Sequence, residues 1–437
     1  MITTLIGRTF LKKYNKEMGT NLSAKDFVST IFFEYFFNHT KYFIWQTNSP
    51  FVQGVTKSKP LTPKERKEKL DNLHEKVEHI TPDASFAIGF PAAEEKEFAT
   101  TSGLVTDLNI QVGDEDIYYS WIGVGLGIGV AGGYCLLIND EEILWRLFLG
   151  WKIYRELLND PTLNKMRPNQ INTWNGQWLT YVLGKDYDPD FDFNTLVSYE
   201  LLKQTDKLIE VNTINWSNLF FSLSLLYPNK VLTAYVYSFG QMNKTIGFIP
   251  LYLKSATRLI DLFKTLFPYT ENQFKANEFQ SLFGIHIKRA CELGVIGLRA
   301  LRPESLKKYL NNNQNLKFKK EEDFLNYRIY KTWLIAMISS NKKETLAYTE
   351  QIAKLLLEYR KGAKKNDRAN LIDKQLFSSN TKKEFIAALV EIIPSLTAEQ
   401  VVLLKELRDR VHLMNSEEFT YFKTLLKFDY AFIEKQN

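Results

Sequence analysis

Residues 322–340, EDFLNYRIYKTWLIAMISS, decide the architecture of the C-terminal part of this chain, because their apolar residues recur with the period of an α-helix. Thr381 or Asn380, Thr397 and Ser416 stand at the starts of later segments, where a hydroxyl or amide side chain can cap a helix. The same helical periodicity continues over residues 343–365, 381–395, 397–412 and 416–435. The sequence therefore predicts an all-helical bundle over residues 321–437.

A polar tract separates this bundle from the rest of the chain. Residues 311–323, NNNQNLKFKKEED, have the composition of a linker. A chain of 437 residues also exceeds what one hydrophobic core normally organises. We therefore predict two domains, 1–320 and 321–437. The 31 Phe and 22 Tyr can fill a large core or form stacking surfaces, and we expect most of the rings in the core.

The N-terminal body is expected to mix helices with short strands. Residues 21–37, 141–158 and 191–226 have helical patterns, and Thr62 with Pro63 can start a further surface helix. Strands are predicted between Phe86 and Ile138, and at 230–241 and 245–253 on either side of a turn at Gly240–Lys244. The expected fold class is α+β: a mixed, aromatic-rich N-terminal body with short strands, followed by an all-α helical bundle.

Charge and cysteine content restrict the partners and the compartment. The net charge of +6 is compatible with a phosphate-bearing partner. Cys135 and Cys291 form no CxxC pair, so no zinc ribbon or disulfide framework is expected, and we predict a reducing, cytoplasmic location. The uncharged run Trp121–Ile138 is rich in glycine and is flanked by acidic residues, so we interpret it as buried strand and turn rather than a membrane span.

Few patterns in this sequence suggest catalysis. Gly127–Gly132 matches GxGxxG, which would place a dinucleotide at a helix N-terminus, but the acidic residue required farther along is not evident. His74 and His79 are five residues apart, so they cannot share a metal on one helix, and we expect both to be solvated. The acidic run Asp186–Asp192 lacks the Gly and Glu of a calcium loop. We expect no enzyme activity, no cofactor and no metal.

Basic clusters mixed with aromatic and amide residues favour a nucleic-acid partner. Lysine and arginine position a phosphate backbone, whereas asparagine and glutamine on loops can contact base edges. Each cluster alone is more often a solvated face, but several occur on this one chain. The candidate nucleic-acid-binding residues are Lys12, Lys13, Asn48, Lys57, Lys59, Gln241, Asn243, Lys244, Lys319, Lys320, Arg360, Lys361, Lys364, Lys365 and Arg368.

Four stretches give the chain a family resemblance. WQTNSPFVQGV at 45–55, GVAGGYCLLI at 129–138, VLTAYVYSFGQMNKTIGFIPLYL at 231–253 and the helix pair at 327–357 occur in the order found in one family. The chain resembles the large subunit of type I CRISPR Cascade complexes, closest to subtype I-B. It departs from many relatives in lacking paired CxxC elements in the N-terminal half, which form structural zinc sites.

The resemblance implies a non-catalytic role in target capture. The N-terminal body would contact the crRNA 5′ handle and a backbone subunit, and its loops would read the protospacer-adjacent motif (PAM) in double-stranded DNA. The C-terminal bundle would resemble the small subunits and line the path of the displaced strand in the R-loop, and the assembled complex would recruit a helicase–nuclease. Two alternatives remain: a dinucleotide-binding enzyme using Gly127–Gly132, or a scaffold protein at a membrane surface.

Overall fold

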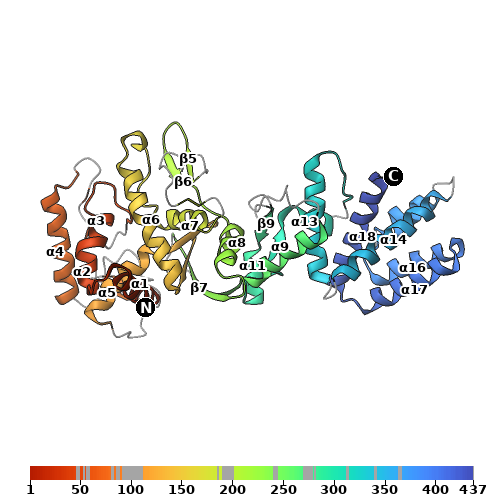
Figure 1. The fold of residues 1–437 in the computed structure, drawn as a ribbon, viewed down its shortest axis with the longest axis horizontal. Helices are drawn as coiled ribbons and strands as arrows, with labels where there is room; N and C mark the ends of the chain where they lie inside the picture. The colour runs from red at the N-terminus through yellow and green to blue at the C-terminus, as the bar shows by residue number, and fades with distance from the viewer. Residues whose placement is uncertain are drawn as a thin grey trace. The chain divides into compact units, whose positions relative to one another are not determined.

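The computed structural model confirms a mixed fold in which helices predominate over short antiparallel strands (Figure 1). The chain divides into two compact units, Met1–Leu253 with Cys291–Val295, and Lys254–Ala290 with Ile296–Asn437. The structure describes residues 1–45, 50–52, 55, 60–79, 83–84, 89–90, 112–184, 187–188, 201–239, 245–268, 279, 282–311, 314–338, 342–362 and 367–436.

The first unit combines helices with short strands. Its helical elements are α1 (Ile2–Met18), α2 (Ala24–Phe27), the π-helix η1 (Val28–Phe32), α3 (Phe33–Phe36), α4 (Pro63–His79), α5 (Asp114–Gly125), α6 (Glu141–Asn159), the 3-10 helix η3 (Pro161–Leu163), α7 (Ile171–Val182) and α8 (Trp216–Leu226). Its strands are β1 (Asp83–Ala84), β2 (Gly89–Phe90), β3 (Ile128–Val130), β4 (Tyr134–Ile138), β5 (Leu202–Gln204), β6 (Ile209–Val211), β7 (Val231–Ser238) and β8 (Thr245–Tyr252).

Helices α1 and α5 approach closely because each presents a glycine to the other's backbone. A Cβ atom on Gly7 would lie 2.0 Å from the carbonyl oxygen of Tyr119, and one on Gly123 would lie 2.0 Å from that of Thr3. The hydroxyls of Thr3 and Ser120 are hydrogen-bonded at 2.7 Å inside this contact. Two small residues therefore set the distance between the helices.

The core of the first unit is largely aromatic, as the composition predicts. Trp151 of α6 is fully buried, and its ring meets that of Phe36 edge-on with centroids 4.7 Å apart. Phe10 of α1 packs edge-on against Phe27 of α2 at 5.5 Å. Edge-to-face geometry places the positive edge of one ring against the negative face of the next. The predicted amphipathic helix after Ser23 forms this wall, capped by a Ser23–Asp26 box.

A four-stranded antiparallel sheet has the order β3-β4-β7-β8. Gly132 and Gly133 have φ values of 89° and 75°, which only glycine adopts readily, and they form the turn between β3 and β4. The two strands predicted around residues 240–244 are confirmed as β7 and β8, with Val231 paired to Tyr252 and Tyr237 to Thr245. The turn between these strands lies outside the described residues.

Two local predictions are wrong. Asp114–Gly125, expected among strands, is helix α5, because its first-turn residues Asp114, Glu115 and Asp116 complement the positive N-terminal end of the helix dipole. Within the stretch 191–226, expected as helix throughout, the described residues form the hairpin β5–β6 before α8 begins. The side chain of Thr205 bonds the backbone of Leu208 across that turn, which favours the hairpin.

The second unit is mainly helical, and after Glu321 none of the described residues is in a strand, as predicted. The elements after β8 are α9 (Lys254–Leu266), β9 (Phe283–Ile285), α11 (Ile287–Leu293), β10 (Leu301–Pro303), the 3-10 helix η6 (Glu304–Leu306), α12 (Lys307–Asn311), α13 (Glu321–Ile338), α14 (Lys342–Lys361), α15 (Asp367–Asn370), the π-helix η7 (Leu371–Leu376), α16 (Lys382–Ile392), the 3-10 helix η8 (Ile393–Ser395), α17 (Ala398–Leu413) and α18 (Ser416–Gln436).

The predicted caps at Thr381 and Thr397 are confirmed as capping boxes with Glu384 and Gln400. The third cap is wrong by one residue. The side chain of Asn415, rather than that of Ser416, accepts a 2.9 Å hydrogen bond from the Glu418 N–H at the start of α18. Asparagine has two acceptor lone pairs on its amide oxygen and ranks with serine as an N-cap, so local composition does not separate the two.

Packing in the second unit begins well before the bundle. Helix α9 packs on α13, and the indole N–H of Trp333 on α13 donates to the carbonyl of Leu301 at 2.5 Å. Compact packing thus joins residues from Lys254 onward to the bundle, while separate folding of 321–437 stays a prediction. In the part of the chain that the structure describes, no helix is both long and apolar enough to cross a membrane.

Candidate nucleic-acid interface

Three of the predicted basic residues already have partners within the chain. Lys13 lies 2.6 Å from Glu142 and 2.8 Å from Glu17, and these two carboxylates raise the pKa of Lys13. A lysine neutralised by two carboxylates contributes little attraction to a phosphate. Lys13 therefore ties α1 to α6 in the free chain.

Arg360 and Arg368 stabilise the end of α14. The Arg360 guanidinium donates to Tyr430 Oη at 3.0 Å and lies 2.5 Å from the Glu434 carboxylate. Arg368 donates to the carbonyl of Tyr359 at 2.9 Å and lies over that ring, 4.5 Å from its centroid. Cations at a helix C-terminus satisfy its last carbonyls and complement its dipole.

The other described candidates are exposed. Lys319 and Lys320 lie at the start of α13, where their backbone N–H groups donate to Asp323 while their side chains face solvent. Lys12 on α1 and Lys361 at the end of α14 are exposed as well. The remaining candidates lie outside the described residues: Asn48, Lys57, Lys59, Gln241, Asn243, Lys244, Lys364 and Lys365.

The β7–β8 hairpin carries two aromatic rings to the surface. Phe248 is 55% exposed and Tyr252 49% exposed, on the face of β8 opposite the buried Ile249 and Leu251. The Phe248 ring meets Tyr235 of β7 edge-on at 5.2 Å. Cross-strand aromatic pairs stabilise the pairing of neighbouring strands. The strands β7 and β8 are thus held together by backbone hydrogen bonds and by this ring contact, and β7 is paired to β4 on its other side.

The sequence did not predict one further group of basic residues. The group lies around the segment 37–45, which we call the basic loop, and consists of Lys41 in that segment, Arg66 of α4 and Arg155 of α6. Arg155 of α6 is 5% exposed and donates to the carbonyls of Tyr35 and Lys41, the latter at 3.0 Å. Its guanidinium lies 4.3 Å from the centroid of the Phe43 ring. Lys41 in turn donates to the carbonyl of Leu158 at the end of α6, at 2.9 Å.

No carboxylate among the described residues neutralises these cations. Arg66 of α4 donates to the side-chain oxygen of Asn38 at 3.2 Å and to the carbonyl of Leu61 at 2.8 Å. Burial and the nearby charge of Arg155 lower the pKa of Lys41. Burial, together with Arg155 and Arg66, lowers the pKa of His39 to about 4, so His39 is neutral at pH 7. The basic loop therefore concentrates positive charge.

Sequence reasoning missed this site because its members are far apart in the chain. Arg155 is 120 residues from Tyr35, the carbonyl that it holds. Lys41 is a single cation in its local sequence, and Arg66 lies in the mixed-charge stretch 64–69, KERKEK, which has the pattern of a solvated helix surface. The one available signal was Trp45, an aromatic residue that opens a stretch of family resemblance.

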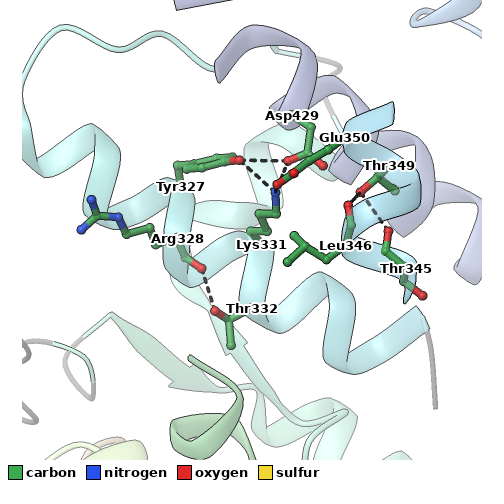
Figure 2. A network of polar contacts seen from close by, with 9 residues as sticks. All are labelled: Tyr327, Arg328, Lys331, Thr332, Thr345, Leu346, Thr349, Glu350 and Asp429. Carbon is green, nitrogen blue, oxygen red and sulfur yellow. Dashed lines mark hydrogen bonds and ion pairs between the residues drawn. The ribbon is translucent and has the colours of Figure 1, made fainter. Parts of the chain in front are cut away.

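A second group of charges is buried in the helical bundle (Figure 2). Lys331 of α13 lies 2.7 Å from Asp429 of α18 and 2.9 Å from Glu350 of α14, and Tyr327 donates to Asp429 at 2.9 Å. The side chains of Lys331 and Asp429 are 1% and 0% exposed. Burial raises the pKa of Asp429 and the charge of Lys331 opposes that rise. Because no substrate can reach so buried a pair, we assign it a structural role.

The sequence patterns that could indicate a dinucleotide or metal site have other roles in the structure. Gly127–Gly132 runs through β3 into a hairpin turn, whereas a dinucleotide site needs a helix to begin there, so the geometry does not support that alternative. His74, expected to be solvated, instead lies between Ser29 Oγ at 3.0 Å and Tyr118 Oη at 2.7 Å. No group of three or more metal-ligating side chains occurs among the described residues, which exclude most of the Asp186–Asp192 run.

No protein-family model matches this chain, and neither a curated protein nor a solved structure matches it. Its function is therefore inferred from its own residues and their geometry.

Proposed function

We propose that this chain is the non-catalytic large subunit of a type I CRISPR Cascade complex. In this role it reads the PAM in double-stranded DNA, helps to open the duplex, stabilises the R-loop and recruits the helicase–nuclease. One observation carries the proposal: the two longest stretches of resemblance fold as the resemblance implies. Among the described residues, 231–238 and 245–252 form the antiparallel pair β7–β8, and 327–338 and 342–357 lie in the consecutive helices α13 and α14.

The hairpin supports the motif-reading part of the proposal. The sequence between β7 and β8 contains Gln241, Asn243 and Lys244, and residue types of this kind can contact base edges through the amides and the backbone through the lysine. The exposed ring of Phe248 supplies apolar surface on β8, three residues after Thr245, whereas the exposed ring of Tyr252 lies at the opposite end of the strand pair. Apolar side chains inserted at a base step are a common means of starting to unstack a duplex.

The helical bundle supports the proposed binding of the displaced DNA strand. Lys319, Lys320 and Lys361 are exposed, whereas Arg360 and Arg368 fasten the helix that carries Lys361. Exposed lysines on a rigid scaffold attract a phosphate backbone without reading its sequence. This division between a reading hairpin and a sequence-independent bundle is what target capture requires.

The test is purification of the tagged, full-length chain from cells that produce it. We expect it to bring down a guide RNA with a constant 5′ handle and protein subunits present in repeated copies. The assembled complex should bind duplex targets only when a short motif flanks the sequence complementary to the guide. A chain that purifies alone, without RNA, would overturn the proposal.

A second arm of the test addresses the motif. We expect Gln241→Ala and Asn243→Ala to change which flanking motifs are bound, because each lost amide contact removes about 1–3 kcal/mol of discrimination. Lys244→Ala in the same turn is the matched control, and it should weaken binding to all motifs alike. Equal losses on all motifs with the amide variants would remove the hairpin from the role of reader.

A further inference from the structure

The basic loop ends in an exposed tryptophan, Trp45. Trp45 is 46% exposed, whereas most other tryptophans of the chain are buried in the core. Its ring stacks on that of Tyr42, with centroids 5.8 Å apart and planes inclined by 27°. Tyr42 is itself 4% exposed, so the stack has one ring anchored in the protein and one in solvent.

The backbone that carries this stack is held in place from several directions. The Asn169 N–H donates to the carbonyl of Tyr42 at 2.9 Å, and the Phe43 N–H donates to that of Phe36 at 3.2 Å. Arg155 and Lys41 hold the loop against the ends of α3 and α6 through the carbonyls described above. A loop fixed in this way loses little conformational entropy when a ligand binds to it.

The same loop has an excess of positive charge around Tyr42, the ring on which Trp45 stacks. Arg66 is near enough to act electrostatically on both His39 and Tyr42, and no described group accepts a bond from its Nη2. Lys41 is half-buried and its ammonium group, with three donors, has two carbonyl partners. Nη1 of the buried Arg155 has no hydrogen-bond partner among the residues that the structure describes.

We propose that the basic loop binds one nucleotide of a single-stranded nucleic acid, with the base stacked on Trp45 and the phosphate held by Arg66 and Lys41. A flat, exposed ring suits a base, and a guanidinium with free N–H groups suits a phosphate. His39 and Arg155 are positioning residues, since one is neutral and the other is buried. The choice of a nucleic acid as the ligand rests on the proposed function. The site itself is one that the sequence did not predict.

Binding of the full-length chain to labelled oligouridylate and to oligodeoxythymidylate of about 10 nucleotides tests the site, since single-strand sites of this kind have that size. We expect Trp45→Ala to weaken binding roughly 5- to 100-fold, and Trp45→Phe to retain most of it, because base stacking on one ring contributes about 1–3 kcal/mol. Comparable binding of both polymers, or tighter binding of the RNA, supports the site equally, because base and phosphate are common to both.

Arg66→Gln should lower the slope of log affinity against log salt by about 0.7, the value for one phosphate contact with a single strand. Arg8→Gln is the matched control, because it makes the same change at an exposed arginine already paired with Asp116 in the same unit. We expect no change of slope with that control. Thermal unfolding of each variant checks that the fold is intact.

A spectroscopic readout separates a ligand contact from a structural role. Because Trp45 is the most exposed tryptophan, acrylamide should quench mainly its fluorescence, and a bound oligonucleotide should protect it. The inference is overturned if the unaltered chain fails to bind single strands at low salt, if Trp45→Ala and Arg66→Gln bind as tightly as the unaltered chain, or if quenching is unchanged by the oligonucleotide.

These outcomes are distinct from failure of the proposed function. A chain that binds single strands through Trp45 but never purifies with a guide RNA would overturn the Cascade assignment and leave the nucleotide site in place. A chain that assembles into such a complex, but whose Trp45→Ala variant fails to assemble while still binding oligonucleotides normally, would show that a protein covers Trp45. That result would overturn the nucleotide site alone.

Discussion

At the scale of single residues, the cations of this chain differ in whether a carboxylate already neutralises them. Lys13 and Arg360 have carboxylate partners, whereas the described carboxylates leave Arg66 and Arg155 without one. A cation with a nearby carboxylate has most of its field cancelled, so it attracts a phosphate weakly. The presence or absence of that partner, more than the number of lysines and arginines, therefore indicates which basic residues can bind nucleic acid.

The buried pair of Lys331 and Asp429 leads to a prediction about stability. Lys331→Met removes the cation and leaves a carboxylate without compensation inside the bundle, so we expect a loss of about 3–5 kcal/mol in the free energy of unfolding. The double variant Lys331→Met with Asp429→Leu should recover most of that loss. Glu350→Gln is the matched control, since Glu350 is 43% exposed and its pairing contributes little. Chemical denaturation measures all three.

The same variant should have a defined pH dependence. Burial raises the pKa of Asp429 above that of the unfolded chain, and without Lys331 only the hydrogen bonds from Thr349 and Tyr327 oppose the rise. The folded state then keeps a proton that the unfolded state releases, so stability falls as the pH rises through about 3.9, the unfolded value. Lys331→Met should therefore be less destabilised near pH 4 than at pH 7. An equal loss at both values would contradict this account of the pair.

At the scale of secondary-structure elements, the position of helices depends on residues with no side chain at all. Gly7 and Gly123 allow the backbones of α1 and α5 to touch, and each glycine faces the other helix within its first or last turns. In a helix interior, glycine is about 1 kcal/mol less favourable than alanine. The close contact, with its buried hydroxyl pair, offsets that local disadvantage.

This contact yields a second prediction. Gly7→Ala should destabilise the protein by about 1–3 kcal/mol despite the better helix propensity of alanine, because the new methyl group would overlap the Tyr119 carbonyl. Lys16→Ala on the exposed side of the same helix is the control, with a change within about 0.5 kcal/mol. Denaturant midpoints give both values. A stabilising effect of Gly7→Ala would mean that the two helices are farther apart than described.

At the scale of the whole molecule, exposed charge is distributed over both compact units. Lys12 and the partly exposed Arg66 belong to the first, and the exposed Lys319, Lys320 and Lys361 belong to the second. A nucleic acid that contacts both units would release counterions from every contact, so its affinity should depend steeply on salt. The mild net charge of +6 therefore understates the local attraction at these surfaces.

The third prediction concerns this distribution. Reversing Lys319, Lys320 and Lys361 to glutamate should weaken duplex binding at low salt and lower the salt slope by about 0.9 per lost contact, with motif preference unchanged. The sequence predicts the same for Lys364 and Lys365. Reversing Lys374, Lys383 and Lys405 makes the same change of charge at exposed positions outside the candidate clusters and away from Arg66 in the sequence. If that control weakens binding equally, the effect comes from net charge alone.

The sequence by itself determined the features that depend on near neighbours along the chain. Helical periodicity located α13, α14 and the helices that follow, and the spacing of Thr381 and Thr397 located two of their caps. Alternation around a turn located β7 and β8. Such patterns are legible because a helix or a hairpin is formed by residues a few positions apart.

Only the tertiary structure decided which charges are neutralised and which rings are exposed. Lys13 meets Glu142 at a separation of 129 residues, and Arg155 meets Tyr35 at a separation of 120. Trp45 is exposed while Trp151 is buried, although both lie in aromatic stretches of sequence. The physical reason is that Coulomb energy and burial depend on distance in space, and local sequence does not determine the distance between residues so far apart.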